Sequence, residues 1–576
     1  MLMNHPNKIL LLLLINHNFF NLQGQQDIMY KDYFRSPMEI ELLLSGNFAE
    51  IRSDHFHSGI DIKTRGVTGQ KVFATADGYI SRIRIEAGGY GKSLYIAHPN
   101  GKTTVYGHLD RFREDINDFV RDQQYKRNSH SLNIYPERNE WVVKKGDIIA
   151  YSGNSGSSAG PHLHYEIRNT GNQKPENVLL YKLILTDTVA PRFLSLWTYS
   201  VTQDGRFTIP EGTNSFDLIR INGRYILKQK DPVMLNGTTG FGIEAFDFLN
   251  GANNKCGLYS IEMLLDDIRT FFMRMDDFSF NESRYVNSFM DYGEKQADNR
   301  IIQKLYLDPN NKLGMYKEVN GLGLVELSDA DTHLVRIIIK DALLNTSELV
   351  FTVIDSGKQP VMPNLKGYLF RFDQDKMFDT GGVTLRIPAY SLYTDIDFLY
   401  TLEDDGEIYL SDIHHLHNPG VPLHSSCELA IRPVKIDDNL KEKATILSID
   451  YEGKITFEGG EWKSGFVHAK VNHFGTFVVG LDTVPPAITP LNINENKDLT
   501  SQSSLRFRVV DNQSGIRSYD GYIDNQWVLF EYDAKNDLVS YAFDKKRLKE
   551  KTMHELELYI VDNKDNIAYF VTEFYW

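Results

Sequence analysis

Internal repetition constrains the fold of this chain more than any other feature of its sequence. The phrase Asp-Thr-Val-Ala-Pro at 187–191 returns as Asp-Thr-Val-Pro-Pro at 482–486. Two further pairs of segments recur in the same order, and an aspartate is matched in each: 243–247 with 507–511, and 333–345 with 554–566. In the last pair an asparagine also follows the aspartate after four residues. Such repetition indicates two copies of one structural module, the first of which carries insertions.

Both copies have the sequence pattern of a β-sandwich. Alternating strands are separated by Asp, Asn and Gly turns, which is typical of immunoglobulin-like or fibronectin-like folds. A third β-rich unit lies between the copies, at about 358–480, and it has no long amphipathic helix pattern. The chain has 576 residues, and at ~150 residues per domain this leaves room for a further domain before the first copy. We therefore predict a mainly β, multidomain protein.

The beginning of the chain resembles a secretory signal peptide. Lys8 precedes an apolar run from Ile9 to Ile15, and a polar stretch with Gly24 follows. The run is far shorter than the ~20 residues that span a bilayer, and no later segment supplies them. We therefore expect export, with residues 1–24 removed and no integral membrane segment in the mature chain.

Charge and cysteine content exclude several classes of function. The chain has 62 Lys and Arg against 77 Asp and Glu, a net charge of −15, so nucleic acid is not an expected partner. Its two cysteines, Cys256 and Cys427, are far apart. They can form neither a disulfide framework nor a thiolate zinc site. A metal would therefore be bound by His, Asp or Glu.

The segment before the first repeat predicts an antiparallel β-domain. Its short apolar and β-branched runs, separated by glycine turns, are 71–74, 79–85, 93–97, 103–106, 141–143, 148–152 and 162–167. One helical pattern, at 111–125, interrupts them. Together with the polar run up to Glu140, this segment is interpreted as an insertion.

This β-domain concentrates histidines at spacings that suit a metal site. His162 and His164 are two residues apart, so on a strand they share one face. One strand is unlikely to direct both imidazoles at one ion, so one should bind metal and the other lie beside it. By the same strand parity, His57 and Asp61 can face one side. Two imidazoles and one carboxylate leave a fourth tetrahedral position open for water, as catalytic zinc sites do.

These motifs resemble the lysostaphin-like, LytM-type zinc metallopeptidases that cut peptidoglycan peptide bridges. The signature is His-x-x-x-Asp early and His-x-His late, and the resemblance covers about 47–167. Gly153 to His164 follows the family's glycine-rich loop, with Ser155 and Ala159 where threonine is usual. The segment from Arg111 to Glu140 is longer than the family minimum, which leaves the shape of the substrate groove undetermined.

The resemblance implies a role for each residue of the site. The zinc ligands would be His57, Asp61 and His164, and the two catalytic histidines that do not bind metal would be His108 and His162. Which catalytic histidine is the base stays open. His55 shares strand parity with His57 and is an alternative ligand. Glu166 shares the face of His164 and either orients that ligand or points outward.

By this resemblance, the chain would be a zinc-dependent endopeptidase with one Zn²⁺, hydrolysing the peptide cross-links of bacterial peptidoglycan in cell-wall remodelling. Some family members have lost ligands and activate other wall hydrolases, so a catalytically silent envelope protein is the alternative. All five expected residues are present here, which favours catalysis. In a third hypothesis the sandwiches hold wall or partner proteins, although their fold decides no function.

These inferences divide the chain into five predicted parts. They are a signal peptide at 1–24, a LytM-like peptidase domain at 25–186, an immunoglobulin-like sandwich at 187–357, a second β-rich module at 358–481 and a C-terminal sandwich at 482–576. We expect the protein in the periplasm or cell envelope. Its expected partners are peptidoglycan stem peptides and, at the sandwich modules, other envelope proteins.

Overall fold

The computed structural model describes residues 33–576 except 182, 184–186, 359–364 and 405–407. The predicted signal peptide lies outside the described residues. The chain is almost entirely β, with an N-terminal sheet domain followed by β-sheet modules, as the sequence predicts. Within the described ranges, no helix is both long enough and apolar enough to cross a bilayer.

The N-terminal domain is built on an antiparallel sheet with strand order β1-β2-β10-β6-β5-β4-β7. These strands are β1 (Leu44–Gly46), β2 (Ile60–Lys63), β4 (Gly78–Ile85), β5 (Lys92–Ala97), β6 (Lys102–Phe112), β7 (Leu132–Ile134) and β10 (His162–Asn169). Shorter strands extend it: β3 (Lys71–Phe73), β8 (Val142–Val143), β9 (Ile148–Ser152) and β11 (Pro175–Glu176). The neighbouring central strands β2, β10 and β6 carry most of the residues that the sequence singles out.

The helix of the predicted insertion begins later than its pattern suggests. Helix α2 spans Glu114–Arg127, because Phe112 ends strand β6. The helix buries Ile116, Val120 and Gln124. Its acidic first turn and basic last turn complement the helix dipole, and Asn128 ends it in the left-handed conformation common at this position.

The two repeated segments have the same strand pairing. In the first, β12 (Arg192–Val201) pairs with β16 (Thr239–Phe246), and β21 (His333–Lys340) lies between β17 (Ser260–Leu265) and β22 (Thr346–Asp355). In the second, β35 (Ala487–Pro490) pairs with β37 (Ser504–Val510), and β42 (Met553–Asp562) lies between β38 (Ile516–Ile523) and β43 (Ile567–Tyr575). The last strand of each also has a parallel neighbour: β14 (Arg224–Leu227) on β22 and β36 (Lys497–Asp498) on β43.

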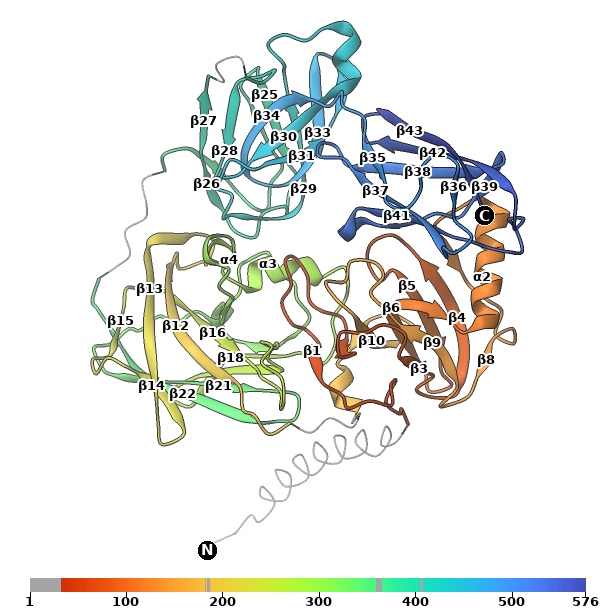
Figure 1. The fold of residues 1–576 in the computed structure, drawn as a ribbon. Coiled ribbons are helices and arrows are strands. Elements are labelled where there is room, and N and C mark those ends of the chain that lie inside the picture. Colours follow the sequence, from red (N-terminus) through yellow and green to blue (C-terminus); the bar gives the residue numbers. More distant parts are fainter. Residues whose placement is uncertain (1–32, 182, 184–186, 359–364, 405–407) are drawn as a thin grey trace, which may run out of the picture.

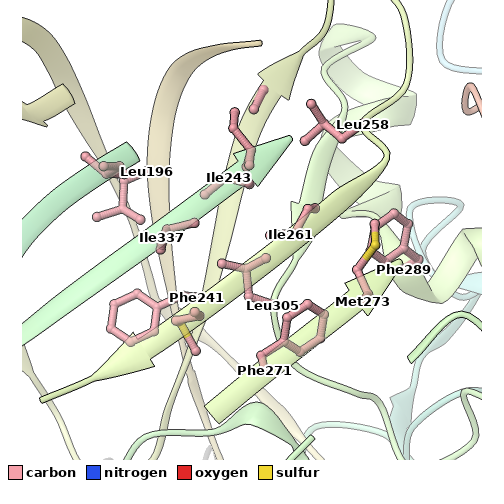
Figure 2. Close-up of a cluster of buried hydrophobic side chains, with 14 of the residues drawn as sticks. Leu196, Phe241, Ile243, Leu258, Ile261, Phe271, Met273, Phe289, Leu305 and Ile337 are labelled. Carbon is pink, nitrogen blue, oxygen red and sulfur yellow. The ribbon is translucent and has the colours of Figure 1, made fainter. Parts of the chain in front are cut away.

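The core of the first sandwich lies between its sheets, where aromatic and branched aliphatic side chains interdigitate (Figure 2). The N-terminal domain contributes to this core. Phe48, Ala49 and Phe56 are buried among its side chains, and the Phe56 ring lies 5.7 Å from that of Phe278. The loop that precedes β2 is therefore held by the module that follows the domain.

The middle unit packs one sheet on another. One sheet contains β24 (Lys376–Asp379), β25 (Val383–Ile387), β29 (Pro422–Ile431), β33 (Phe466–His473) and β32 (Glu461–Lys463). The other contains β27 (Tyr400–Glu403), β28 (Ile413–Leu416), β34 (Gly475–Leu481), β30 (Ala444–Ile449) and β31 (Ile455–Gly459). Their inward-facing residues form a core that includes Cys427, which is a free thiol, as is the buried Cys256.

The chain closes into a ring in which the C-terminal sandwich returns to the N-terminal domain (Figure 1). The C-terminal sandwich contacts helix α2, where Arg547 forms an ion pair with Asp122 and lies over the ring of Tyr125. Lys92 pairs with Glu531 across the same interface. The segment that the sequence analysis interprets as an insertion thus contacts the C-terminal sandwich of the same chain.

Candidate active site

Three side chains converge on one point of the central sheet. His57 Nε2 lies 3.0 Å from Asp61 Oδ1 and 3.1 Å from His164 Nδ1, and the last two atoms are 2.9 Å apart. All three residues are buried, and together they could hold a metal ion. Ligand atoms about 2.0–2.2 Å from a tetrahedral ion are separated by roughly 3.3–3.5 Å, so a small outward shift would admit Zn²⁺.

Strand pairing brings the three side chains together. In the antiparallel register of β2 and β10, Asp61 lies directly opposite His164. His57 is not on that strand, since β2 begins at Ile60, so shared strand parity is the wrong reason for its position. Hydrogen bonds between the His57 backbone and the backbones of Ala49 and Glu50 hold it instead.

Each candidate imidazole ligand is held through one nitrogen and directs its other nitrogen at the cluster. His57 Nδ1 lies 2.7 Å from the carbonyl oxygen of Asn47, so its N–H donates there and the lone pair remains on Nε2. His164 Nε2 lies 2.8 Å from Glu166 Oε1, so its other nitrogen faces the cluster. Burial opposes ionisation of Asp61, but the surrounding histidines hold its pKa well below its usual range. Burial would lower the pKa of His164, but Asp61 and Glu166 outweigh it and raise that pKa to about 9, so a bound metal would displace its proton. The donor set is two imidazole nitrogens and a carboxylate, which fits Zn²⁺.

A buried carboxylate supports the His164 ligand from behind. Glu166 is fully buried and also accepts hydrogen bonds from Ser58 and Tyr90, and Arg168 pairs with its second oxygen. Burial would raise the pKa of Glu166, but Arg168 and His164 lower it far below its usual value. A histidine fixed by an ionised carboxylate is the usual outer support of a bound metal, so of the two predicted roles for Glu166 the structure favours orientation of the ligand.

The two remaining histidines line the same place. His162 Nδ1 lies 2.8 Å from the Gly160 carbonyl oxygen, and its Nε2 is 3.4 Å from Asp61 Oδ1. His108 Nδ1 lies 2.8 Å from the Ser155 carbonyl oxygen. The His108 and His162 rings are 4.8 Å apart. Each ring is thus anchored through Nδ1 and leaves Nε2 available.

His108 differs from the other histidines in backbone and charge. Its φ of 57° is in the left-handed region, which few non-glycine residues adopt. Burial, together with His164 and His162, lowers its pKa to about 3. An imidazole with this pKa is neutral at physiological pH and is a weak proton acceptor.

The alternative ligand His55 does not join the cluster. Its side chain is exposed and its Nδ1 lies 2.9 Å from Asp54 Oδ1. The structure thus brings together His57, Asp61 and His164 with His108 and His162 beside them, and leaves His55 out.

Sequence reasoning missed two residues of this site. The Arg52 guanidinium lies 2.9 Å from Asp61 Oδ2, which leaves Oδ1 directed at the histidines. The Tyr90 ring stacks on His164 at 5.0 Å with a tilt of 21°. Neither residue belongs to a motif of regular spacing. Both reach the site through loop conformations that periodicity does not encode.

The sequence of this region matches a known family. Residues 55–126 and 127–176 match peptidase family M23. Residues 55–176 are an M23 domain. Residues 367–482 match a Zu5-like domain, so the chain contains a second matched domain besides the M23 domain.

Relatives of the M23 domain include peptidases and an activator. An uncharacterized metalloprotease of Haemophilus influenzae is 31% identical over 174 residues, which cover 29% of this chain and 30% of that protein. The DD-carboxypeptidase/endopeptidase Mpg of Neisseria meningitidis is 35% identical over 115 residues, 20% of each chain. The murein hydrolase activator NlpD of Escherichia coli is 33% identical over 129 residues, 22% of this chain and 27% of NlpD. The chain thus spans less than a third of the length of these relatives.

Solved structures of M23 proteins are also similar to the domain. The catalytic domain of the prophage-encoded M23 protein EnpA from Enterococcus faecalis is 25% identical, covers 26% of this chain and 95% of its own, and has a TM-score of 0.19. A zinc-containing peptidase from Vibrio cholerae is 24% identical and covers 26% of this chain and 39% of its own, also with a TM-score of 0.19.

Loss of the Tyr90 hydroxyl should weaken metal binding moderately. Tyr90 reaches His164 through Glu166, with a distance of 2.6 Å from its hydroxyl to Glu166 Oε1. Direct supports of metal ligands are worth about 10–100-fold in affinity, so for Tyr90→Phe, one step further out, we expect a loss of roughly 3–10-fold. Competition against a chromophoric chelator measures it. The exposed Tyr135 supplies the control, Tyr135→Phe; equal affinities of all three proteins would contradict the assigned role.

Proposed function

We propose that this chain is a zinc endopeptidase that hydrolyses peptide cross-links of bacterial peptidoglycan in cell-wall remodelling. One observation carries the proposal: His57, Asp61 and His164 converge at 2.9–3.1 Å, and two further histidines lie beside them. Within the described part of the chain, no fourth His, Cys, Asp or Glu completes that group. A three-ligand site is the open form that catalytic zinc uses.

The ligands of a single Zn²⁺ would be His57 Nε2, Asp61 Oδ1 and His164 Nδ1. Bound there, the ion would supply Lewis acidity toward the scissile carbonyl and lower the pKa of water toward ~7. Arg52 orients the Asp61 carboxylate, and Glu166 fixes the ring of His164.

The two remaining histidines would stabilise the negative charge of the oxyanion and transfer protons. His162 Nε2 lies 3.4 Å from Asp61 Oδ1, and the His108 ring lies 5.8 Å from that of His164. Both imidazoles thus adjoin the place where a carbonyl oxygen would become negative and an amine would leave. One donates a hydrogen bond to the oxyanion and the other transfers a proton to the departing nitrogen. Which of the two histidines acts as the base stays open.

A regulatory role is the second candidate, because the E. coli relative is named a murein hydrolase activator. The complete donor set with its buried Glu166 support argues for catalysis instead. The proposal includes export to the periplasm or envelope and the five-part division of the chain. It leaves the bond open: D-Ala to meso-diaminopimelate links in a Gram-negative host, or glycine and other bridges in a Gram-positive one.

Product analysis with defined cross-linked muropeptides tests the proposal. Full-length protein stripped of metal should be inactive. When Zn²⁺ is added, each chain should bind about one ion and cleavage should return. Mass spectrometry of the products identifies the bond. Stoichiometric zinc without cleavage of any wall type would favour the regulatory role over the endopeptidase.

A further inference from the structure

Three repeat-matched aspartates of the first sandwich meet at one end of that module. Asp187 precedes β12, Asp247 follows β16 and Asp341 follows β21, so the chain brings them from three distant segments. Their exposed fractions are 7%, 1% and 3%, and one carboxylate oxygen from each lies within 4.8 Å of the others. Three buried carboxylates this close repel one another strongly in a medium of low polarity.

These carboxylates have only some of the partners that buried charges need. Asp341 accepts hydrogen bonds at both oxygens, and Asp187 accepts them at Oδ1. Asp187 Oδ2 and Asp247 Oδ1 are buried and accept no hydrogen bond from any described residue. No Lys, Arg or His of the described chain forms an ion pair with any of the three. Burial, and next to it the charge of Asp341, raises the pKa of Asp247 to about 8. Buried unpaired oxygens of this kind normally contact a partner or coordinate a metal.

The second copy of the module also brings its matched aspartates together, and there the buried oxygens are hydrogen-bonded. Asp482 accepts hydrogen bonds at both oxygens, from the backbone of Val484 and Ser514 and from Asn566. Asp562 likewise accepts at both oxygens. Asp511 is only half-buried and accepts from two backbone amides. Asp341 has the same asparagine hydrogen bond as Asp562, so the copies differ at the other two positions. There only the first copy has buried carboxylate oxygens without a partner among the described residues.

The chemistry of the first cluster selects a hard cation. Its ligand atoms are carboxylate oxygens, without the nitrogen or sulfur that zinc prefers. Calcium accepts several carboxylates in a flexible geometry, whereas magnesium is usually held by one or two carboxylates and keeps several waters. We propose that Asp187, Asp247 and Asp341 form a calcium site.

The position of this site gives it a consequence for the M23 domain. Asp247 and Cys256 pair through their backbones, at 2.9 and 3.0 Å. The backbone of the next residue, Gly257, forms two hydrogen bonds with the Asn47 side chain, at 2.8 and 2.9 Å. The Asn47 carbonyl in turn accepts the hydrogen bond from His57. Calcium would thus order the loop on which the conformation at His57 depends.

Calorimetric titration of the full chain tests the site. The protein is stripped of metal, given one equivalent of Zn²⁺, and titrated with Ca²⁺. We expect saturable binding that Asp247→Asn weakens at least tenfold, while the matched Asp511→Asn changes it less than twofold. Absence of calcium binding by the unmodified protein would overturn the proposal, as would an equal loss in Asp511→Asn or an equal affinity for Mg²⁺.

Thermal unfolding gives an independent signature that separates a ligand from a structural residue. Without calcium, Asp247→Asn should unfold at or above the temperature of the unmodified protein, because it removes a carboxyl group whose ionisation is opposed by burial and by Asp341. With calcium, only the unmodified protein should gain several degrees in Tm. A variant that is destabilised equally with and without calcium would show a structural role and overturn the site. These measurements need no peptidase activity, so their outcome does not depend on the proposed function.

Discussion

Alanine at His164 should abolish both zinc binding and cleavage, whereas alanine at His162 should abolish cleavage and largely keep zinc. His164 Nδ1 is within 3.1 Å of both other candidate ligand atoms, so its loss leaves two donors. His162 lies beside the cluster and is anchored to Gly160. Removing a ligand lowers zinc affinity by orders of magnitude, and removing an acid or base lowers the rate by about 10²–10⁴-fold.

The two readouts must be measured on the same preparations. Zinc is counted by elemental analysis after dialysis, and cleavage is followed on cross-linked muropeptides. The exposed His55 supplies the control, since His55→Ala removes an imidazole near the site without touching the cluster. Equal zinc loss in His162→Ala and His164→Ala would reverse the assignment of the two strand histidines.

Much of the site could be predicted from sequence because its residues obey local rules. The period of a strand places His162 and His164 on one face, and β10 includes both residues. A carboxylate and a third imidazole occur at fixed spacing in the same domain. What spacing could not supply is the pairing register that sets Asp61 opposite His164, which is a long-range property of the sheet.

Packing between modules was beyond the reach of sequence patterns. The loop that carries His57 is held by Phe48 and Phe56, which are buried in the core of the following sandwich. No periodicity of the N-terminal segment indicates a partner more than 200 residues away, yet Phe56 contacts Phe278 and Phe289. The geometry of the candidate metal site therefore depends on the sandwich, which gives this module a structural role in the M23 domain.

The sequence repeat identified the matched aspartates but did not reveal their hydrogen-bond partners. It singled out Asp187, Asp247 and Asp341 as matched positions, but only Asp187 and Asp247 have a buried oxygen without a partner, since Asp341 is hydrogen-bonded as Asp562 is. The difference arises in neighbouring loops such as 511–515, whose backbone amides donate to Asp511. A shared sequence pattern thus fixed the positions of the carboxylates but not their partners.

Alanine at Gly59 should disrupt the site without removing any of its ligands. A Cβ at this position would lie 2.3 Å from the Tyr165 carbonyl oxygen and 2.8 Å from Glu166 Cγ. Both contacts are with β10, whose backbone cannot retreat without breaking its pairing with β2. Overpacking of this kind costs about 1–3 kcal/mol of stability. Because Gly59 lies two residues from His57, we expect zinc affinity to fall at least tenfold as well.

Gly160 provides the matched control for this substitution. It lies in the glycine-rich loop before His162 and its carbonyl accepts the hydrogen bond from His162, but a Cβ there would meet no atom within 4 Å. Gly160→Ala should therefore keep both stability and zinc affinity close to those of the unmodified protein. Zinc titration and denaturant unfolding of the two variants measure both quantities. If Gly59→Ala behaved like Gly160→Ala, the close approach of the His57 loop to β10 would not be what positions this ligand.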